Sequence, residues 1–308
     1  MPLQPPATLS GDLLTISRFL QSPTALQRRL RDFRDMRFVS DQILTQRFRS
    51  TGGAVLYEQS EPFVTDRAIE AVAPGSAYPF ANLPTGTAAL AAIVKWGQKV
   101  RLTDEEITRN VYAGAAVDRS LRKVVNSIIA QVDSITMSAV SSALANTATT
   151  GIWDHATAAT RKPLDDILLA IQAIEDRNMG YVPDTLVVSP KAYTYLMLNE
   201  LVASLRQRET TDNPVYTGQL ERITGLAILK TPNITPATSA FVIDSKQLGG
   251  MADELDGAPG YAVADLAVQT KAIRQDGLDA WDLQGRRKTV PVVQETGAGQ
   301  EITGVVAP

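Results

Sequence analysis

The sequence contains no cysteine and a single histidine, His155, among its 308 residues. The absence of cysteine excludes disulfides, thiolate metal sites and a cysteine nucleophile. One histidine also excludes the HExxH zinc motif and any histidine-rich metal site. His155 lies in a stretch rich in Ala and Thr, where nothing indicates an oriented catalytic base, so we expect an exposed loop histidine.

Motifs for nucleotide chemistry and for hydrolysis are also missing. No GxGxxG follows a predicted strand, and neither GxxxxGK[ST] nor GxSxG occurs. Glu105 and Glu106 are adjacent on a predicted helix and point about 100° apart, so they do not converge on one site. Thr103 and Glu106 instead match a capping box. We therefore predict a protein that is not an enzyme and uses no cofactor and no metal.

Two short charged runs have simple structural explanations. The segment DELDG at 253–257 lacks the oxygen-ligand spacing of a calcium loop, so we expect a solvated turn. Arg286, Arg287 and Lys288 form a basic run. An exposed strand end explains this run better than a nucleic-acid patch does.

Long apolar runs are absent as well. The longest, Ala88 to Val94, is far too short to span a bilayer. The N-terminus shows no basic region followed by an apolar run. We expect a protein without a membrane partner that stays in the compartment where it is made.

Charge is distributed unevenly along the chain. Residues 1–50 contain eight arginines, no lysine and four aspartates, which gives +4, whereas the rest carries −7, for a net charge of −3. A basic arm on an acidic body can contact an acidic partner, including nucleic acid. A solvated helix face explains the same residues equally well, because the apolar residues between Thr24 and Phe48 fit one or two amphipathic helices.

The stretch EQSEPFVTDRAIEAVAPGSAYPFANLP, residues 58–84, has no sustained helical or strand period. It is too apolar for a disordered linker, so its apolar side chains need a surface to pack against. Predicted strands at 53–58 and 93–100 bracket it. We therefore expect a long two-stranded arm with an irregular tip.

The rest of the pattern alternates between helix and strand. The clearest helix is Asp118–Asn146, whose unbroken apolar stripe predicts a rod about 40 Å long. An α–β–α unit follows at 163–197, with Ser189 as a helix N-cap before a proline. We expect loops at 146–160 and 249–260. The further predicted strands are 226–229, 240–244, 261–273, 286–294 and 301–306.

Three strings stand out within this order of parts: VKWGQKVRLTDEEI at 94–107, YVPDTLVVSPKAYTYLM at 181–197 and DGLDAWDLQGRRKTVPVVQETGAGQEITGV at 276–305. The strings and the order of parts resemble the major capsid protein of tailed bacteriophages, the Hong-Kong-ninety-seven-type fold that encapsulins share. The resemblance covers nearly the whole chain. It implies an α+β fold, the phage major capsid fold with an N-terminal arm, an extended two-stranded loop, a long spine helix, a peripheral domain and an α/β axial domain.

The resemblance also implies a division of the chain. The implied parts are an arm at 1–50, an extended loop or hairpin at 51–100, a peripheral domain at 101–160 and 261–308 with its spine helix at 116–147, and an axial domain at 161–260.

The function that the resemblance implies is structural. Many copies would self-assemble, as hexamers and pentamers, into an icosahedral shell around non-specifically held double-stranded DNA. Assembly would take place in the host bacterial cytoplasm and end in the virion capsid, with scaffold, portal and decoration proteins as further partners. An encapsulin-like compartment around a cargo enzyme is the alternative. An enzyme with an α/β core at 161–245 is a third hypothesis, for which the sequence supplies no site.

In such a shell the extended loop would lie over the adjacent subunit, which would bury its apolar residues. We predict Phe63, Tyr78 and Phe80 as the anchors, because aromatic side chains dominate interface energetics. Lys95, on the returning strand, is a further candidate for contact between subunits, and some relatives join subunits through a lysine–asparagine bond. The candidates in the arm for contact with DNA, scaffold or a neighbouring copy are Arg28, Arg29, Arg31 and Arg34.

Overall fold

The computed structural model describes residues 38–109, 113–200, 202, 220–255, 260–263 and 267–307. The chain divides into two compact units. Unit 1 comprises 1–38, 94–132 and 253–289, and unit 2 comprises 39–93, 133–252 and 290–308. The predicted arm contacts Arg28, Arg29, Arg31 and Arg34 lie outside the described residues.

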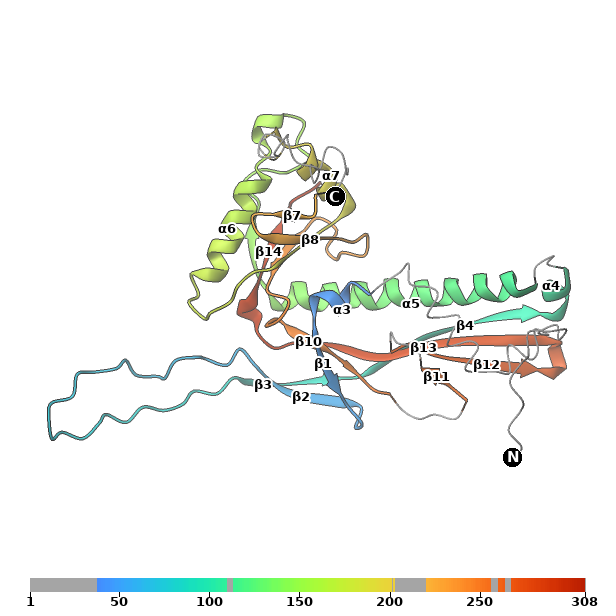
Figure 1. Cartoon of the computed structure of the whole chain (residues 1–308), viewed down its shortest axis with the longest axis horizontal. Helices are drawn as coiled ribbons and strands as arrows, with labels where there is room; N and C mark the ends of the chain where they lie inside the picture. The colour runs from blue at the N-terminus through green and yellow to red at the C-terminus, as the bar shows by residue number, and fades with distance from the viewer. Residues whose placement is uncertain are drawn as a thin grey trace, which may run out of the picture. The chain divides into compact units, whose positions relative to one another are not determined.

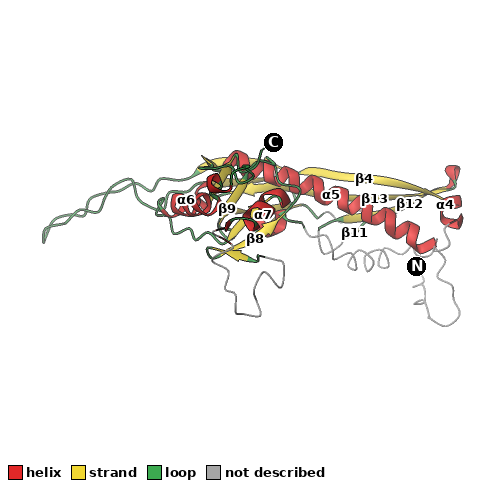
Figure 2. Cartoon of the chain, turned by 90° about the horizontal axis from the view of Figure 1, so that it is seen from above, coloured by secondary structure: helices red, strands yellow, loops and turns green. Residues whose placement is uncertain are grey.

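Unit 1 is built on an antiparallel sheet that runs along helix α5 (Ala113–Ala143), as Figures 1 and 2 show. Its strand order is β4–β13–β12–β11. The strands are β4 (Val94–Thr103), β13 (Ala280–Val293), β12 (Gln269–Gln275) and β11 (Ala262–Val263). The short helix α4 (Asp104–Arg109) follows β4, and the 3-10 turn η2 (Asp276–Leu278) joins β12 to β13. The C-terminal ends of α5 and β13, after residues 132 and 289, belong to unit 2.

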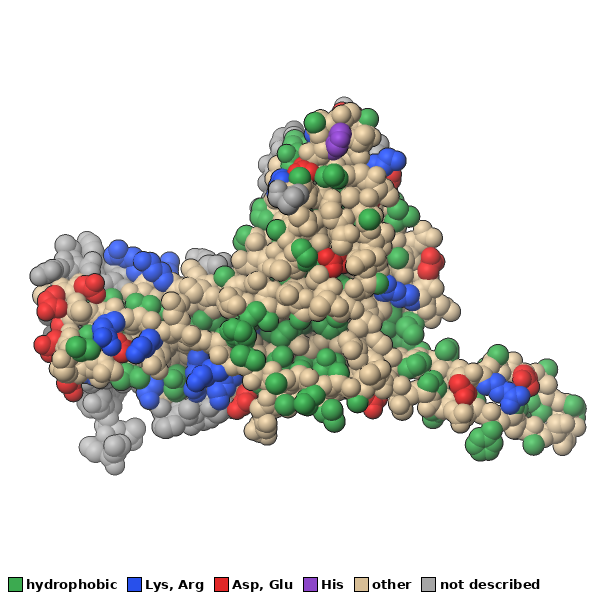
Figure 3. All heavy atoms as spheres, turned by 180° about the vertical axis from the view of Figure 1, so that it is seen from behind, with side chains coloured by type: hydrophobic (Ala, Val, Ile, Leu, Met, Phe, Trp, Pro, Cys, Tyr) green, Lys and Arg blue, Asp and Glu red, His purple; other side chains and the backbone are tan. Residues whose placement is uncertain are grey.

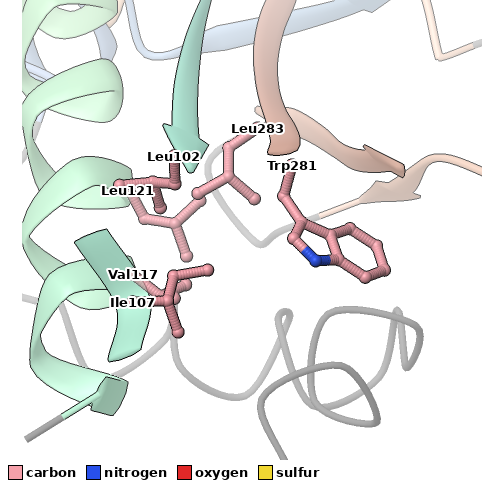
Figure 4. Close-up of a cluster of buried hydrophobic side chains, with 6 residues drawn as sticks. All are labelled: Leu102, Ile107, Val117, Leu121, Trp281 and Leu283. Carbon is pink, nitrogen blue, oxygen red and sulfur yellow. The ribbon is translucent and has the colours of Figure 1, made fainter. Parts of the chain in front are cut away.

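The core of this sheet and helix is a cluster of buried apolar side chains (Figure 4). The cluster consists of Leu102, Ile107, Val117, Leu121, Trp281 and Leu283. Trp281 and Leu283 lie two residues apart on β13 and therefore point to the same face of the sheet. Val117 and Leu121 lie four residues apart on α5, which places them on one side of the helix.

Helix α5 approaches β13 closely because residue 285 has no side chain. A Cβ atom at Gly285 would lie 2.7 Å from Cγ1 of Val124 and 3.1 Å from Cδ1 of Ile128. We expect Gly285→Ala to lower the free energy of unfolding by about 1–3 kcal/mol, the usual effect of overpacking a core. Denaturant titration measures this change. Gly277→Ala is the matched control, because its Cβ atom would meet nothing within 4 Å; equal effects at the two positions would contradict the close approach.

The predicted capping box at the start of α4 is confirmed. The backbone N–H of Glu106 donates to Oγ1 of Thr103 at 3.3 Å, and the backbone N–H of Thr103 donates to Oε2 of Glu106 at 3.2 Å. We expect Thr103→Ala to lower the free energy of unfolding by about 1 kcal/mol, because a helix N–H loses its acceptor. Thr103→Ser keeps the oxygen and should lose much less in the same denaturant titration. If serine does not restore stability, the cap is not the cause.

Unit 2 contains a second sheet, of mixed direction, with the strand order β5–β14–β9–β6–β8–β7. The strands are β5 (Ala145–Ala148), β14 (Gly299–Thr303), β9 (Ala240–Ile243), β6 (Thr185–Val188), β8 (Leu226–Lys230) and β7 (Arg222–Ile223). Helix α6 (Pro163–Glu175) packs on β14 and β9, and α7 (Pro190–Met197) follows β6. Two 3-10 turns, η1 (Ala158–Thr160) and η3 (Thr296–Ala298), complete the unit. The predicted α–β–α unit is confirmed, since the Ser189 hydroxyl accepts the Ala192 N–H at 3.2 Å.

The end of the predicted arm is anchored in unit 2. Helix α3 (Ser40–Ile43) leads into strand β1 (Gln46–Arg49), which lies beside β10 (Gly249–Asp253). The Asp133 carboxylate accepts the backbone N–H groups of Ser40 at 3.0 Å and Val39 at 3.3 Å. Burial raises the pKa of Asp133 above its ordinary value, although these hydrogen bonds oppose the shift.

The hairpin that carries the irregular stretch differs from the prediction in its returning strand. Strand β2 (Ala54–Gln59) pairs antiparallel with β3 (Thr87–Ala92), from Ala54 opposite Ala92 to Gln59 opposite Thr87. The predicted returning strand at 93–100 is instead part of β4, which pairs with β13. The apolar run that begins at Ala88 is therefore a hairpin strand, and Lys95 does not lie on the hairpin.

Five other predictions need correction. The segment 249–260 does not begin as an exposed loop, because all five residues of β10 are buried. Asp253 is therefore not part of a solvated turn. Arg287 does not lie at an exposed strand end but is fully buried in the middle of β13. The predicted loop at 146–160 begins in strand β5, which runs parallel to β14, and the long helix begins at 113 rather than 118.

His155 is an exposed loop residue, as predicted, and its Nδ1 accepts the backbone N–H of Thr157 at 3.0 Å. Among the described residues, no group of three or more His, Cys, Asp or Glu side chains is placed to hold a metal ion. In the same part of the chain, no helix combines the length and the apolar character needed to cross a bilayer.

Candidate functional site: the extended loop

Residues 60–86, here named the extended loop, connect β2 to β3 and run away from the rest of unit 2 as two irregular, roughly antiparallel segments (Figure 1). The chain reverses at Ala73-Pro74-Gly75-Ser76, where the Ser76 N–H donates to the Ala73 carbonyl at 3.0 Å. Gly75 has φ +86°, and proline followed by glycine with positive φ is typical of a type II turn. The sequence therefore fixes the position of the tip.

A polar pair ties the two segments of the extended loop together. The Asp66 carboxylate accepts the backbone N–H of Asn82 at 2.8 Å and its side-chain amide at 2.9 Å. Nearer the tip, Arg67 pairs with Glu70 at 2.9 Å within one segment. The acidic side chains Asp66 and Glu70 thus have partners inside the loop.

The base of the extended loop is docked on its own unit. Ser60 donates its backbone N–H to the Gln294 carbonyl at 2.8 Å, and its hydroxyl lies 2.7 Å from that of Thr296. The Phe63 ring meets the Tyr181 ring edge-on, with centroids 6.3 Å apart. Burial, together with the hydrogen bond from the Tyr181 hydroxyl to Glu295, raises the pKa of Tyr181 well above its ordinary value. The base is therefore held, whereas the tip extends beyond these contacts.

The extended loop exposes an unusual amount of apolar surface, visible as green side chains along it in Figure 3. Phe80 is 94% exposed and Tyr78 86% exposed. The other large exposed apolar side chains of the loop are Phe63, Val64, Ile69 and Leu83. Several large apolar side chains exposed on one segment indicate an interaction site on a soluble protein.

The predicted contact residues of the loop differ in how far they are exposed. Tyr78 and Phe80 are open to a partner, whereas Phe63 is 58% exposed because it packs on Tyr181. Sequence reasoning missed Leu56 and Leu90, which are opposite each other on β2 and β3 and are 74% and 70% exposed. The apolar run at 88–94 could have indicated an exposed apolar strand, but the sequence does not show that this run pairs with β2.

Comparison with known proteins agrees with this architecture. The chain is similar in structure to a phage-related protein from Bordetella bronchiseptica RB50, with 13% identity, 92% of this chain and 97% of that chain covered, and a TM-score of 0.60. It is also similar to the capsid protein of cyanophage P-SCSP1u, with 12% identity, coverage of 88% and 89%, and a TM-score of 0.62. The capsid of an empty GTA particle matches with 10% identity, coverage of 88% and 91%, and a TM-score of 0.60. No curated protein matches the chain in sequence.

The α+β fold is thus the fold of phage shell proteins, as the resemblance implied. A family model described as phage capsid protein matches residues 86–302, and the chain belongs to this family. Its function is that of a major capsid protein, a structural component of a phage virion. This membership favours a phage shell over an encapsulin-like cargo compartment.

Proposed function

We propose that copies of this capsid protein form hexamers and pentamers that close into an icosahedral shell around double-stranded DNA, with the extended loop of each copy lying over the adjacent subunit. The exposed apolar surface of the extended loop is the observation that carries the proposal. Burying apolar area stabilises an interface by about 25 cal/mol per Å². The prolines of the loop limit its freedom before docking, which lowers the entropy lost on assembly.

We further propose that assembly takes place in the host bacterial cytoplasm, with scaffold, portal and decoration proteins as additional partners. The arginines Arg28, Arg29, Arg31 and Arg34 are the proposed contacts of the arm with DNA, scaffold or a neighbouring copy. Their positive charge in a chain of net charge −3 supports this proposal. The proposed domain division remains an arm at 1–50, a hairpin at 51–100 that contains the extended loop, a peripheral domain at 101–160 and 261–308, and an axial domain at 161–260.

Light scattering coupled to size exclusion, with negative-stain imaging of the leading peak, tests the shell. We expect uniform, round particles of megadalton mass from the purified chain or from the chain co-expressed with its neighbouring genes. Nuclease treatment of particles made during infection then tests whether they enclose DNA. We expect the enclosed double-stranded DNA to be protected from digestion. A chain of 33.2 kDa that stays monomeric in both settings would refute the proposal.

The open aromatic side chains should contribute strongly to assembly. We expect Tyr78→Ser with Phe80→Ser to raise the protein concentration needed for assembly by about tenfold or more, because buried aromatic anchors often contribute more than 1 kcal/mol each. Light scattering over a concentration series measures this threshold. Val182→Ser with Leu198→Ser is the matched control, since both side chains are exposed and lie outside the loop. An equal shift in the control would mean that any loss of apolar surface weakens assembly.

A further inference from the structure

Ser60, the first residue of the extended loop, is fastened to unit 2 by two hydrogen bonds. Its backbone N–H donates to the Gln294 carbonyl at 2.8 Å, and its hydroxyl lies 2.7 Å from that of Thr296. Its φ is +55°, in the left-handed region that residues other than glycine rarely adopt. Such a conformation persists where the surrounding contacts fix it. The two hydrogen bonds therefore fix the direction in which the loop leaves β2.

Three residues further along the loop, the Phe63 ring rests on a side chain that the rest of unit 2 holds in place. This partner, Tyr181, is 4% exposed and donates its hydroxyl to the Glu295 carboxylate at 2.8 Å. Gly297 makes room for the Tyr181 ring, because a Cβ atom at residue 297 would lie 2.9 Å from its Cε2 atom. We name the contacts that Ser60 and Phe63 make with unit 2 the latch.

The rest of the extended loop takes its direction from the latch. In the described part of the chain, residues 64–85 form hydrogen bonds only with one another. The returning segment is tied to the first one, since the Asp66 carboxylate accepts both the backbone N–H and the side-chain amide of Asn82. Contacts at the base of the loop therefore orient both of its segments.

We propose that Ser60 and Phe63 are positioning residues for assembly: in the free chain they hold the extended loop in the direction that it keeps over the neighbouring subunit. This inference rests on the proposed function, because it assigns the orientation of the docking loop to a contact within one copy. A loop that is already held in its bound direction loses less entropy on docking, so assembly begins at a lower protein concentration. Any loss from the latched population weakens the apparent affinity in proportion.

A latch that keeps the loop away from its partner is the competing interpretation, and the exposure of the aromatic side chains argues against it. Phe80 is 94% exposed and Tyr78 86% exposed while the latch is closed. The latch covers only part of Phe63, which is 58% exposed. A contact that blocked assembly would have to cover the side chains that assembly uses. The closed latch instead leaves them open to a neighbouring subunit.

A reversible lock tests the inference. The chain has no cysteine, so Ser60→Cys with Thr296→Cys allows only one disulfide within a copy, where two hydroxyl oxygens now lie 2.7 Å apart. We expect the oxidised lock to assemble at the same protein concentration as the unaltered chain or at a lower one, measured by light scattering over a concentration series. An oxidised lock that assembles only after reduction overturns the inference, because the loop would then have to leave the latch.

Phe63→Ala separates positioning from direct contact with the neighbour. We expect it to raise the concentration needed for assembly by about fivefold, because losing an aromatic pair of ordinary strength lowers the latched population by about that factor. The oxidised lock should restore assembly of Phe63→Ala, since the disulfide replaces the missing contact. Ile69→Ala is the matched control: Ile69 is fully exposed and outside the latch, so the lock should not restore what this variant loses. Failure of the lock to rescue Phe63→Ala, or equal rescue of both variants, overturns the inference.

A measurement on unassembled chains tests the latch without relying on shells. Spin labels on Ala77→Cys, near the loop tip, and on Lys246→Cys, an exposed position in unit 2, report their separation by double electron–electron resonance. We expect Phe63→Ala to broaden the distribution of distances, and an equal width with and without this substitution overturns the inference. Absence of shells from the unaltered chain refutes the proposed function, whereas shells that form equally well with Phe63→Ala refute only this inference.

Discussion

A chain in which Asn-Gly replaces residues 67–81 should fold normally and form no shells. Asp66 and Asn82, which flank the excision, are already joined by two side-chain hydrogen bonds, so a two-residue turn can close the gap. The excision removes the exposed side chains Ile69, Tyr78 and Phe80 but leaves Ser60 and Phe63 docked at the base. In the part of the chain that the structure describes, residues 67–81 make no hydrogen bond to anything outside the loop. We therefore expect the free energy of unfolding to change by less than about 1 kcal/mol, within the usual range for surface changes.

The loss of assembly should be complete, because the excised chain lacks Ile69, Tyr78 and Phe80 together with the length of loop that would carry them to a neighbouring subunit. Size exclusion with light scattering measures the fraction of protein in particles, and denaturant titration confirms the fold. A second variant, in which a Gly-Ser segment of equal length replaces 67–81, tests whether assembly needs the length of the loop or its side chains. We expect it to fail as well, since it has the length without the aromatic anchors. Normal shells from either variant would remove these residues from the assembly surface.

The elements that could be predicted from sequence are those with local signals. Helix α7 begins where Ser189 caps a helix whose first residue is proline, and α4 begins at a capping box. Both signals act within four residues, so they need no knowledge of the rest of the fold. The tip of the extended loop is local in the same sense, because Pro74-Gly75 specifies the turn without help from another segment.

The hairpin was predicted only in part because strand pairing is not local. Strands β3 and β4 are separated by Ile93 alone, and the apolar run from Ala88 to Val94 crosses from one strand into the other. Only the pairing partners distinguish them: β3 lies against β2, whereas β4 pairs with residues nearly 200 positions later, such as Thr289 opposite Val94. A period-two pattern predicts a strand, but it does not identify the neighbour.

The basic run at 286–288 was also misassigned because its environment depends on residues that are distant in sequence. Arg286, Arg287 and Lys288 are adjacent in sequence, yet the alternation of a strand sends Arg287 to one face and its neighbours to the other. A charged side chain is rarely buried unless it is paired. The partner of Arg287 is Asp253, which the sequence places in an acidic run that resembles a turn. Neither run alone shows that two of its members form a buried ion pair.

This buried pair carries the second large prediction: Asp253→Ala should lower the free energy of unfolding by about 3–5 kcal/mol. Nε and one Nη of Arg287 reach the two carboxylate oxygens of Asp253 at 3.1 and 3.2 Å. The guanidinium also lies 4.3 Å from the centre of the Phe38 ring, and the whole side chain is buried. Removing the carboxylate leaves a buried cation without its counter-charge, which costs more than the pair itself contributes. Denaturant titration measures the loss, which is a large part of a typical stability of about 5–15 kcal/mol.

Replacing both partners separates the cost of an unpaired charge from the cost of lost packing. We expect Asp253→Leu with Arg287→Met to recover most of the stability that Asp253→Ala loses, because apolar side chains of similar volume need no counter-charge. Asp253→Glu is a weaker control, since it keeps the charge but shifts its position. If the double variant is no more stable than Asp253→Ala, packing around Phe38 and not charge is the main contribution of this site. A loss below about 1 kcal/mol for Asp253→Ala would instead mean that water reaches the guanidinium, as it does at surface ion pairs.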